Sequence, residues 1–184
     1  DNNFISGNGT AAYGNMAGLA STFTAEANNA RSVIGGDTTS AHTITQVRTL
    51  RSKLDDIFID NAVWLCSSQV KAELFGRLAG DVGGLGMADI AGKQVDTFLG
   101  FPIVTSRAMN SNTNTGGNVV DVYFGDFAKL GMFGARTSLD IQISTDARFE
   151  SDQAVARGIC RHGITLHETG STTQAGAVVA LWQT

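Results

Sequence analysis

Proline, cysteine, histidine and charge are all scarce in this sequence, and each scarcity narrows the class of protein. The 184 residues include one proline, two cysteines and three histidines. Hydrophobic residues make up 42% of the chain and charged residues 16%, values that exclude wholesale disorder. No apolar run approaches the roughly 20 residues that span a bilayer, and no signal-like segment opens the chain. We therefore expect a soluble globular protein with no membrane partner.

The chain also lacks a basic excess. Its net charge is -4, and Lys and Arg are scattered along the sequence. Proteins that grip nucleic acid through its phosphates usually carry a basic face, so we expect only weak, non-specific contact with DNA. Cys66 and Cys160 are too far apart in sequence to suggest a disulfide framework, and we expect both to be small buried hydrophobes in a reducing compartment.

Catalytic motifs are equally scarce. The sequence contains neither G-x-S-x-G nor G-x-x-x-x-G-K-[ST]. Cys160 and His162 alternate on one face of a predicted strand, with Glu168 nearby, so a metal pair or a small hydrolase is conceivable. Zinc takes three or four protein ligands, however, and His167 falls on the opposite face. We expect no metal site, no cofactor and no enzymatic activity.

Apolar periodicity does predict regular elements in the first half. A stripe with intervals of three and four predicts a helix on Ile44, Val47, Leu50, Leu54 and Ile57. The run Ala62–Ser67 predicts a buried strand, and Ser67 or Ser68 can cap the helix that follows. That second helix has an apolar stripe of Val70, Leu74 and Leu78. A strand followed directly by a helix indicates a mixed layer of strands and helices.

Two further segments differ in character. Five glycines interrupt all periodicity between Gly80 and Gly92, which predicts a mobile surface loop. By contrast, Leu139, Ile141 and Ile143 alternate with polar residues, and Gln153–His167 continues as a second strand. A strand of that length would span about 50 Å, far beyond the usual three to ten residues. We expect a long hairpin arm.

The apolar face of the arm needs a covering element, and the helices predicted from this sequence do not supply one. One face of its second strand is small and apolar, but both predicted helices belong to the strand–helix unit around Trp64. The chain opens at Asp1 without Met or a helix-start signature. We expect this sequence to be the C-terminal part of a longer product, with a covering helix located before Asp1.

Several stretches, in this order, resemble a known family. They are FISGNGTAAYGNMAGL, then TFLGFPIVTSRAMN, then the run from VYFGDF through RTSLDIQIS to ITLHE, and finally GAVVALWQT. This series is similar to the major capsid proteins of tailed phages with the Hong Kong 97-type fold. At its centre, Gly100 permits a sharp turn and Pro102 fixes φ at the start of the next strand, where its missing N–H is not needed.

The resemblance implies an α+β fold, with a small mixed sheet flanked by helices plus a long β-hairpin arm. It implies an axial domain over residues 19–128 and 169–184 and an incomplete peripheral domain over 1–18 and 129–168. The implied function is a shell subunit that forms pentamers and hexamers around packaged phage or prophage double-stranded DNA. The implied partners are other copies, a scaffold, a maturation protease and a portal. Its place would be the virion capsid, assembled in the host bacterial cytoplasm.

Two surfaces are the expected contacts between subunits. The glycine-rich loop would lie at the capsomer axis and is represented by Gly83, Gly84 and Gly86. The hairpin tip would form ion pairs with neighbours through Asp146, Arg148, Glu150 and Asp152, since interleaved charges at a projecting tip suit such pairs.

Two alternatives stay open at this point. An encapsulin-like compartment would share the fold and enclose protein cargo, and phage genes for terminase and portal nearby would argue against it. A hydrolase using Cys160, His162 and Glu168 would lose its activity when Cys160 becomes Ala. The shell hypothesis predicts only a packing cost of about 1–2 kcal/mol for that change.

Overall fold

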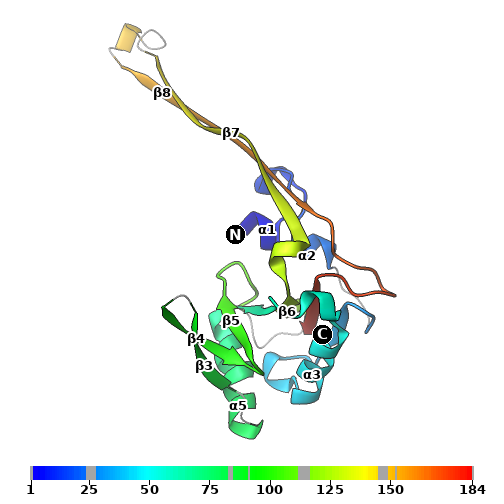
Figure 1. The fold of residues 1–184 in the computed structure, drawn as a ribbon. Coiled ribbons are helices and arrows are strands. Elements are labelled where there is room, and N and C mark those ends of the chain that lie inside the picture. The colour runs from blue at the N-terminus through cyan, green and yellow to red at the C-terminus, as the bar shows by residue number, and fades with distance from the viewer. Residues whose placement is uncertain are drawn as a thin grey trace.

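A folded body and one long projecting arm make up the molecule (Figure 1). The computed structural model describes residues 2–23, 28–82, 85–90, 92–111, 117–144, 149–151 and 153–183. In the part so described, no helix has the length and apolar character needed to cross a membrane. The arm is a single hairpin, and all other strands belong to the body.

The elements are short except in the arm. The helices and helical turns are α1 (Asn2–Ser6), η1 (Ala11–Tyr13), α2 (Leu19–Thr22), η2 (Thr39–Ala41), α3 (Ile44–Lys53), η3 (Asp56–Phe58), α4 (Ser68–Val70), the π-helical η4 (Lys71–Gly76), α5 (Arg77–Val82), α6 (Phe127–Leu130) and η5 (Phe149–Ser151). The strands are β1 (Ser32–Ile34), β2 (Val63–Cys66), β3 (Leu85–Ile90), β4 (Lys93–Phe98), β5 (Phe101–Thr105), β6 (Val119–Gly125), β7 (Gly131–Ser144), β8 (Val155–Leu166) and β9 (Val178–Gln183).

The body is built on one mixed sheet of seven strands. Their order is β1-β9-β6-β2-β5-β4-β3, with β1/β9 and β2/β5 parallel and the remaining pairs antiparallel. The C-terminal strand β9 therefore lies between β1 and β6, deep in the sheet. This arrangement confirms the predicted α+β class with a mixed sheet and a hairpin arm.

Both faces of the central strands are buried. On one face, Trp64 stacks on Phe124 with ring centroids 4.0 Å apart and contacts Phe75 and Phe98. Its indole nitrogen donates to the backbone oxygen of Phe98 at 2.9 Å. The other face carries a second cluster that includes Tyr123 and the N-terminal helices α1 and α2. The body is thus a three-layer unit with its own core.

Helix α3 begins as its sequence predicts and ends earlier. Thr43 forms a capping box with Gln46, and Val47 and Leu50 are buried against the sheet. The helix stops at Lys53, and the Asp55 side chain accepts a hydrogen bond from the Ile57 backbone at the start of η3. Ile57 is consequently 68% exposed, so its predicted place on the buried stripe was wrong.

The second helical segment matches its prediction closely. The Ser67 side chain accepts from the backbone N–H of Val70 and caps the segment, which continues through α4, η4 and α5. Its stripe of Val70, Leu74 and Leu78 is buried, as predicted, and packs in the cluster around Trp64.

A tight turn explains the single proline. Leu99 and Gly100 both have positive φ, at 50° and 87°, and connect β4 to β5 in two residues, as in a type I′ hairpin. Pro102 is the second residue of β5, and pairing of β5 with β2 begins only at Ile103. The missing N–H of Pro102 therefore costs no ladder hydrogen bond with β2.

Candidate functional site

The arm is the most unusual feature of the structure. Strands β7 and β8 pair antiparallel from Gly131 opposite Leu166 to Ser144 opposite Val155. Figure 1 shows the pair leaving the body and extending well past it. Register shifts on either side of Thr137 interrupt the ladder, as bulges do where a long ribbon bends. The predicted long second strand is confirmed, with bounds at Val155 and Leu166.

The root of the arm is fixed to the body. Backbone N–H groups of His167 and Glu168 both donate to the carbonyl oxygen of Leu130, at 3.0 and 3.3 Å. Leu130 is itself fully buried, and Leu166 packs against the same cluster as Tyr123. The arm therefore starts from a rigid base.

One face of the arm is apolar and open to solvent. Cross-strand partners share a face, so Ile141 lies with Gly158 and Ile143 with Ala156. Leu139, Ile141 and Ile143 are 65%, 62% and 72% exposed. We call these three residues the apolar stripe of the arm. Neither α3 nor the segment from α4 to α5 covers it, in accord with the prediction that the local helices belong to the body.

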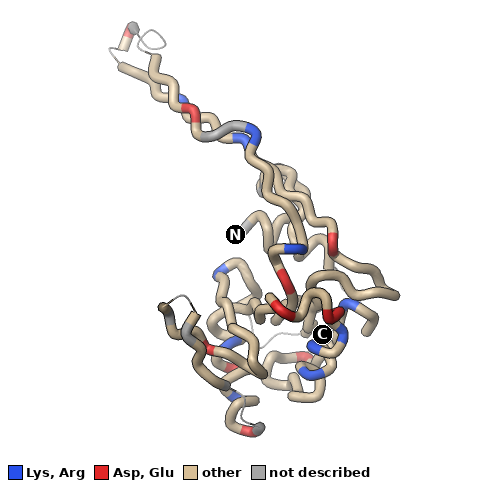
Figure 2. Tube along the Cα trace, in the orientation of Figure 1, with Lys and Arg blue, Asp and Glu red and all other residues tan. Residues whose placement is uncertain are grey.

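The opposite face of the arm is mostly polar, although it also carries Val155 and Ile159. Arg157 pairs with Gln142, and Arg161 pairs with Thr137, on the face that also carries Asp140. Figure 2 shows basic and acidic residues interspersed along the described parts of the arm and the body. The arm is thus an amphipathic ribbon, suited to packing one face against another protein surface.

The predicted contacts at the tip are only partly described. Glu150 lies in the short helical turn η5 and is exposed. Asp146, Arg148 and Asp152 lie outside the described residues. Their proposed ion pairs with neighbouring subunits remain a prediction.

The glycine-rich segment differs from its prediction. Residues 85–90 form strand β3, which pairs with β4 from Leu85 opposite Phe98 to Ile90 opposite Lys93. Gly86 sits in β3, opposite Thr97, whereas Gly83 and Gly84 lie outside the described residues. The prediction of a loop over this part was wrong. These residues form a strand by pairing with β4, and their glycine content does not reveal that pairing. We call β3 and β4 together the ribbon.

Cys160 and His162 do share a face, but not a pocket. The Cys160 sulfur lies 3.9 Å from His162 Nδ1, and the His162 ring packs beside Phe133. Cys160 is exposed, which corrects the prediction that it is a buried hydrophobe; Cys66 is buried as predicted. Among the described residues, no group of three or more His, Cys, Asp or Glu side chains is placed to hold a metal ion.

A carboxylate–imidazole pair, missed from sequence, lies inside the body. Asp121 sits where the β6–β9 register shifts, and its Oδ2 lies 2.9 Å from His42 Nε2. The same oxygen accepts from Thr39 at 2.7 Å, and Oδ1 accepts from Asn110 at 3.0 Å. His42, Asp121 and Thr39 are all fully buried. No substrate can reach this cluster, so it fastens the segment before α3 to β6.

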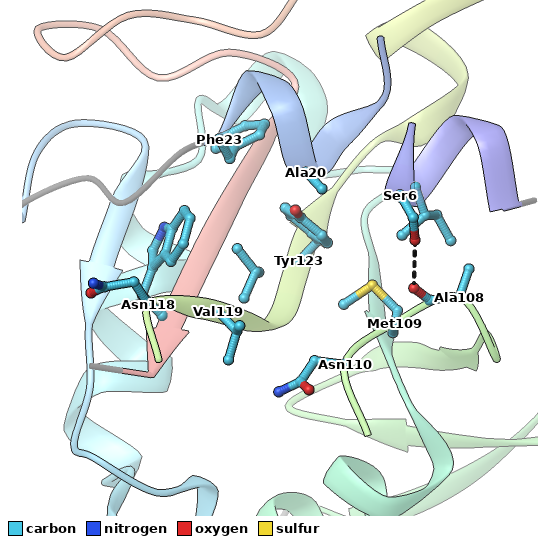
Figure 3. Close-up of a pocket in the computed structure, with 12 residues that line it drawn as sticks. Ser6, Ala20, Phe23, Ala108, Met109, Asn110, Asn118, Val119 and Tyr123 are labelled. Carbon is cyan, nitrogen blue, oxygen red and sulfur yellow. Dashed lines mark hydrogen bonds between the residues drawn. The ribbon is translucent and has the colours of Figure 1, made fainter. Parts of the chain in front are cut away.

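The cavity in Figure 3 has a volume of about 230 Å³ and lies between the N-terminal helices and β6. Phe23, Met109 and Tyr123 line it, and the Ser6 hydroxyl donates to the Ala108 carbonyl at 3.0 Å beside them. Tyr123 is the titratable residue of this lining, and burial raises the pKa of its hydroxyl. The lining offers no acid–base pair for catalysis.

The family can now be stated. A model of the phage capsid family matches residues 1–171, and the chain belongs to that family. This match confirms the family that the sequence resembles. A search of curated protein sequences finds no match.

Solved structures share the fold. The capsid of a native GTA particle, computed with C5 symmetry, matches with a TM-score of 0.65 at 19% identity over 97% of this chain and 58% of that one. The capsid of the empty GTA particle matches with a TM-score of 0.64, also at 19% identity, over 98% and 59%. The holo-SrpI encapsulin complex from Synechococcus elongatus PCC 7942 matches with a TM-score of 0.54 at 13% identity, over 82% and 52%. The chain therefore spans a little over half the length of each GTA capsid chain.

Proposed function

We propose that this chain is a non-enzymatic subunit of an icosahedral shell, which tiles with copies of itself as pentamers and hexamers around packaged double-stranded DNA. The arm is the observation that carries the proposal. It extends from a rigid root and exposes the apolar stripe of Leu139, Ile141 and Ile143. An arm that projects this far beyond its body offers its polar face and its tip to neighbouring copies, as a shell subunit requires.

The energetics of the arm support the same function. A two-stranded hairpin is marginally stable by itself in water, and three strands or a packed helix are needed for independent stability. The arm therefore needs a partner surface. We propose that a helix of the same full-length chain covers the apolar stripe and that the polar face and the tip meet neighbouring copies.

The mechanism of such a shell is geometric. Each subunit makes several modest contacts, and closed symmetry links them so that the assembly persists although single contacts are weak. We assign residues 19–128 and 169–184, which form most of the body, to the capsomer axis, and residues 1–18 and 129–168 to the periphery. Scaffold, maturation protease and portal are the proposed partners during assembly in the host cytoplasm, and the virion capsid is the final location.

Charges at the tip provide a focused test. Arg148, between Asp146 and Glu150, is proposed to pair with a neighbouring copy. Arg148→Glu should weaken assembly, more so at low salt, and leave the melting temperature of the unassembled chain unchanged. Arg48→Glu is the matched control, because Arg48 is exposed on α3 and lies in the body, away from the tip. A melting temperature lowered by the Arg148 change would contradict the assignment.

Electron microscopy of the full-length protein tests the function as a whole. Uniform closed shells, or sheets and tubes of hexamers, are the expected result. A monomer or dimer that persists at high concentration, with scaffold supplied, would overturn the proposal.

An encapsulin-like compartment is the second candidate, since the encapsulin match covers 82% of the chain. Purified shells distinguish the two by their contents. Nuclease-protected DNA supports the phage-type capsid, and a stoichiometric cargo protein without DNA supports the compartment.

A further inference from the structure

The ribbon of β3 and β4 leaves the sheet almost at once. Only Thr97 and Phe98 of β4 pair with β5, opposite Pro102 and Phe101. Beyond Thr97, the ribbon consists of two strands that pair with each other alone among the described residues. Figure 1 shows it at the side of the body, away from the arm.

The two turns that bound β4 fix the direction of its backbone groups. Ile90 and Lys93 pair across a two-residue connection, so their backbone N–H and C=O groups hydrogen-bond to each other. Because these groups alternate in direction along a strand, those of Val95 and Thr97 also point toward β3. Phe98 pairs with Phe101 across the two-residue turn at Leu99, so its groups point the other way. Both turns therefore predict the same directions for the backbone groups of β4.

Two free edges follow from this alternation. On β3, the backbone groups of Leu85, Met87 and Asp89 point away from β4. On β4, those of Gln94 and Asp96 point away from β3, and no strand of the described chain pairs with them there. Met87 is 67% exposed and Ile90 is 44% exposed, so apolar side chains accompany these open edges.

We infer that the ribbon is a ring-closing element: the β3 edge of one copy pairs antiparallel with the β4 edge of the next around a capsomer axis. The partner is a second copy because the two edges differ and run in opposite directions. When identical ribbons are arranged by rotation, each β4 meets a neighbouring β3, and the alternation of strand directions continues without a break. Closing the ring also removes two edges that would otherwise invite aggregation.

Rotation about an axis also predicts the register. We take the strands of the ribbon to run along the axis. Rotation then moves a copy without shifting it along its strands, so residues at one height stay at that height. Met87 and Asp96 face each other within a copy. Met87 of one copy is therefore placed opposite Asp96 of the next. The inference rests on the proposed shell function and adds the contact that closes its rings.

Proline tests the backbone pairing. Met87→Pro and Gln94→Pro each remove an N–H that points outward, and edge positions tolerate proline. Each should reduce the yield of closed capsomers by about tenfold or more, since main-chain hydrogen bonds give strand addition its affinity. Met87→Ala and Gln94→Ala retain the N–H and should assemble like the wild type. Equal assembly of the proline and alanine variants would overturn the inference.

Cysteine cross-linking tests the register and does not depend on how proline is tolerated. Full-length Met87→Cys and Asp96→Cys copies, both with Cys160→Ser, are mixed, assembled and oxidised, so a disulfide between these positions can form only between copies. A covalent dimer of the two variants is expected. Asp96 loses a half-exposed ion pair with Lys71, which contributes little. Met87→Cys mixed with Ile57→Cys, on the distant exposed turn η3, is the negative control.

The outcomes separate this inference from the proposed function. Shells with the cross-link support both. Shells without the cross-link, or a Met87→Cys disulfide to a different protein, overturn the ring contact and leave the shell function standing. Failure of the unmodified full-length protein to form shells overturns the function, and the ring contact with it.

Discussion

Body and arm arrange their apolar residues differently, with opposite results. In the body, strands β2, β6 and β9 are nearly continuous apolar runs that bury both faces, and Trp64 lies among Phe75, Phe98 and Phe124. In the arm, Ile141 and Ile143 alternate with polar residues and remain exposed. The body completes its own core, whereas the arm is completed only by another surface.

This difference separates stability from assembly. Side chains of the body determine whether the chain folds, because their burial provides the free energy of folding. Side chains of the arm contribute little to folding and are available for contacts made later. Substitutions in the two regions should therefore affect different measurements.

The largest effect on stability is expected at Trp64. Trp64→Ala removes a fully buried indole, its stack on Phe124 and its hydrogen bond to Phe98. The free energy of unfolding should fall by about 4–5 kcal/mol, which lowers the melting temperature by roughly 10–15 °C. Urea denaturation of the 184-residue chain measures it. A loss comparable to that of a surface substitution would mean that the body is not packed as described.

The buried polar cluster should come next. Asp121→Ala leaves His42, Thr39 and Asn110 without their shared acceptor. Orphaned buried polar groups are costly, and we expect a loss of about 3–4 kcal/mol. Asn110→Ala is the control, because it leaves Asp121 bonded to His42 and Thr39, and it should cost about 1 kcal/mol. If both variants lose the same amount, Asp121 does not organise this cluster.

Local pattern was enough to predict several of these elements. The strand at β2, the Ser67 cap with its stripe of Val70, Leu74 and Leu78, and the long strand β8 all depend on residues close in sequence. The turn after β4 likewise follows from Gly100, whose positive φ a glycine adopts without strain.

The errors share a different cause. Ile57 continues the spacing of α3, but Leu54 already ends the helix and Asp55 begins a new turn. Pairing of β3 with β4, and of Asp121 with His42, joins residues that no local period connects. Cys160 lies on a small apolar face that resembles a core strand, and its exposure is decided by what lies beside the arm. Whether a strand face is buried depends on the surface that packs against it, and the periodicity of the strand's own sequence does not reveal that surface.

The arm should show the reverse of Trp64. Replacing Ile141 and Ile143 together by Ser changes side chains that are already exposed, so the free energy of unfolding of the chain should shift by less than about 0.5 kcal/mol. Shell yield from the full-length protein carrying the same pair should fall sharply, because the apolar stripe loses its fit to its partner. Gln142→Ser, between them on the polar face, is the matched control. A large loss of stability in the chain itself would show that the arm is part of the folding core.

The smallest perturbation, alkylation of the two thiols, compares the regions without any substitution. The thiolate is the reactive form, and burial raises the pKa of Cys66 to about 12. At pH 8 about one Cys66 thiol in ten thousand is ionised, whereas Cys160 lies exposed on the arm. Iodoacetamide should therefore modify Cys160 and spare Cys66 until the chain unfolds, which peptide mass spectrometry measures. Because the folded state holds the Cys66 proton more tightly than the unfolded state, stability should also decline as pH rises above about 9. In assembled full-length shells, protection of Cys160 would show directly that a partner covers this face of the arm, and unchanged reactivity there would contradict such a cover.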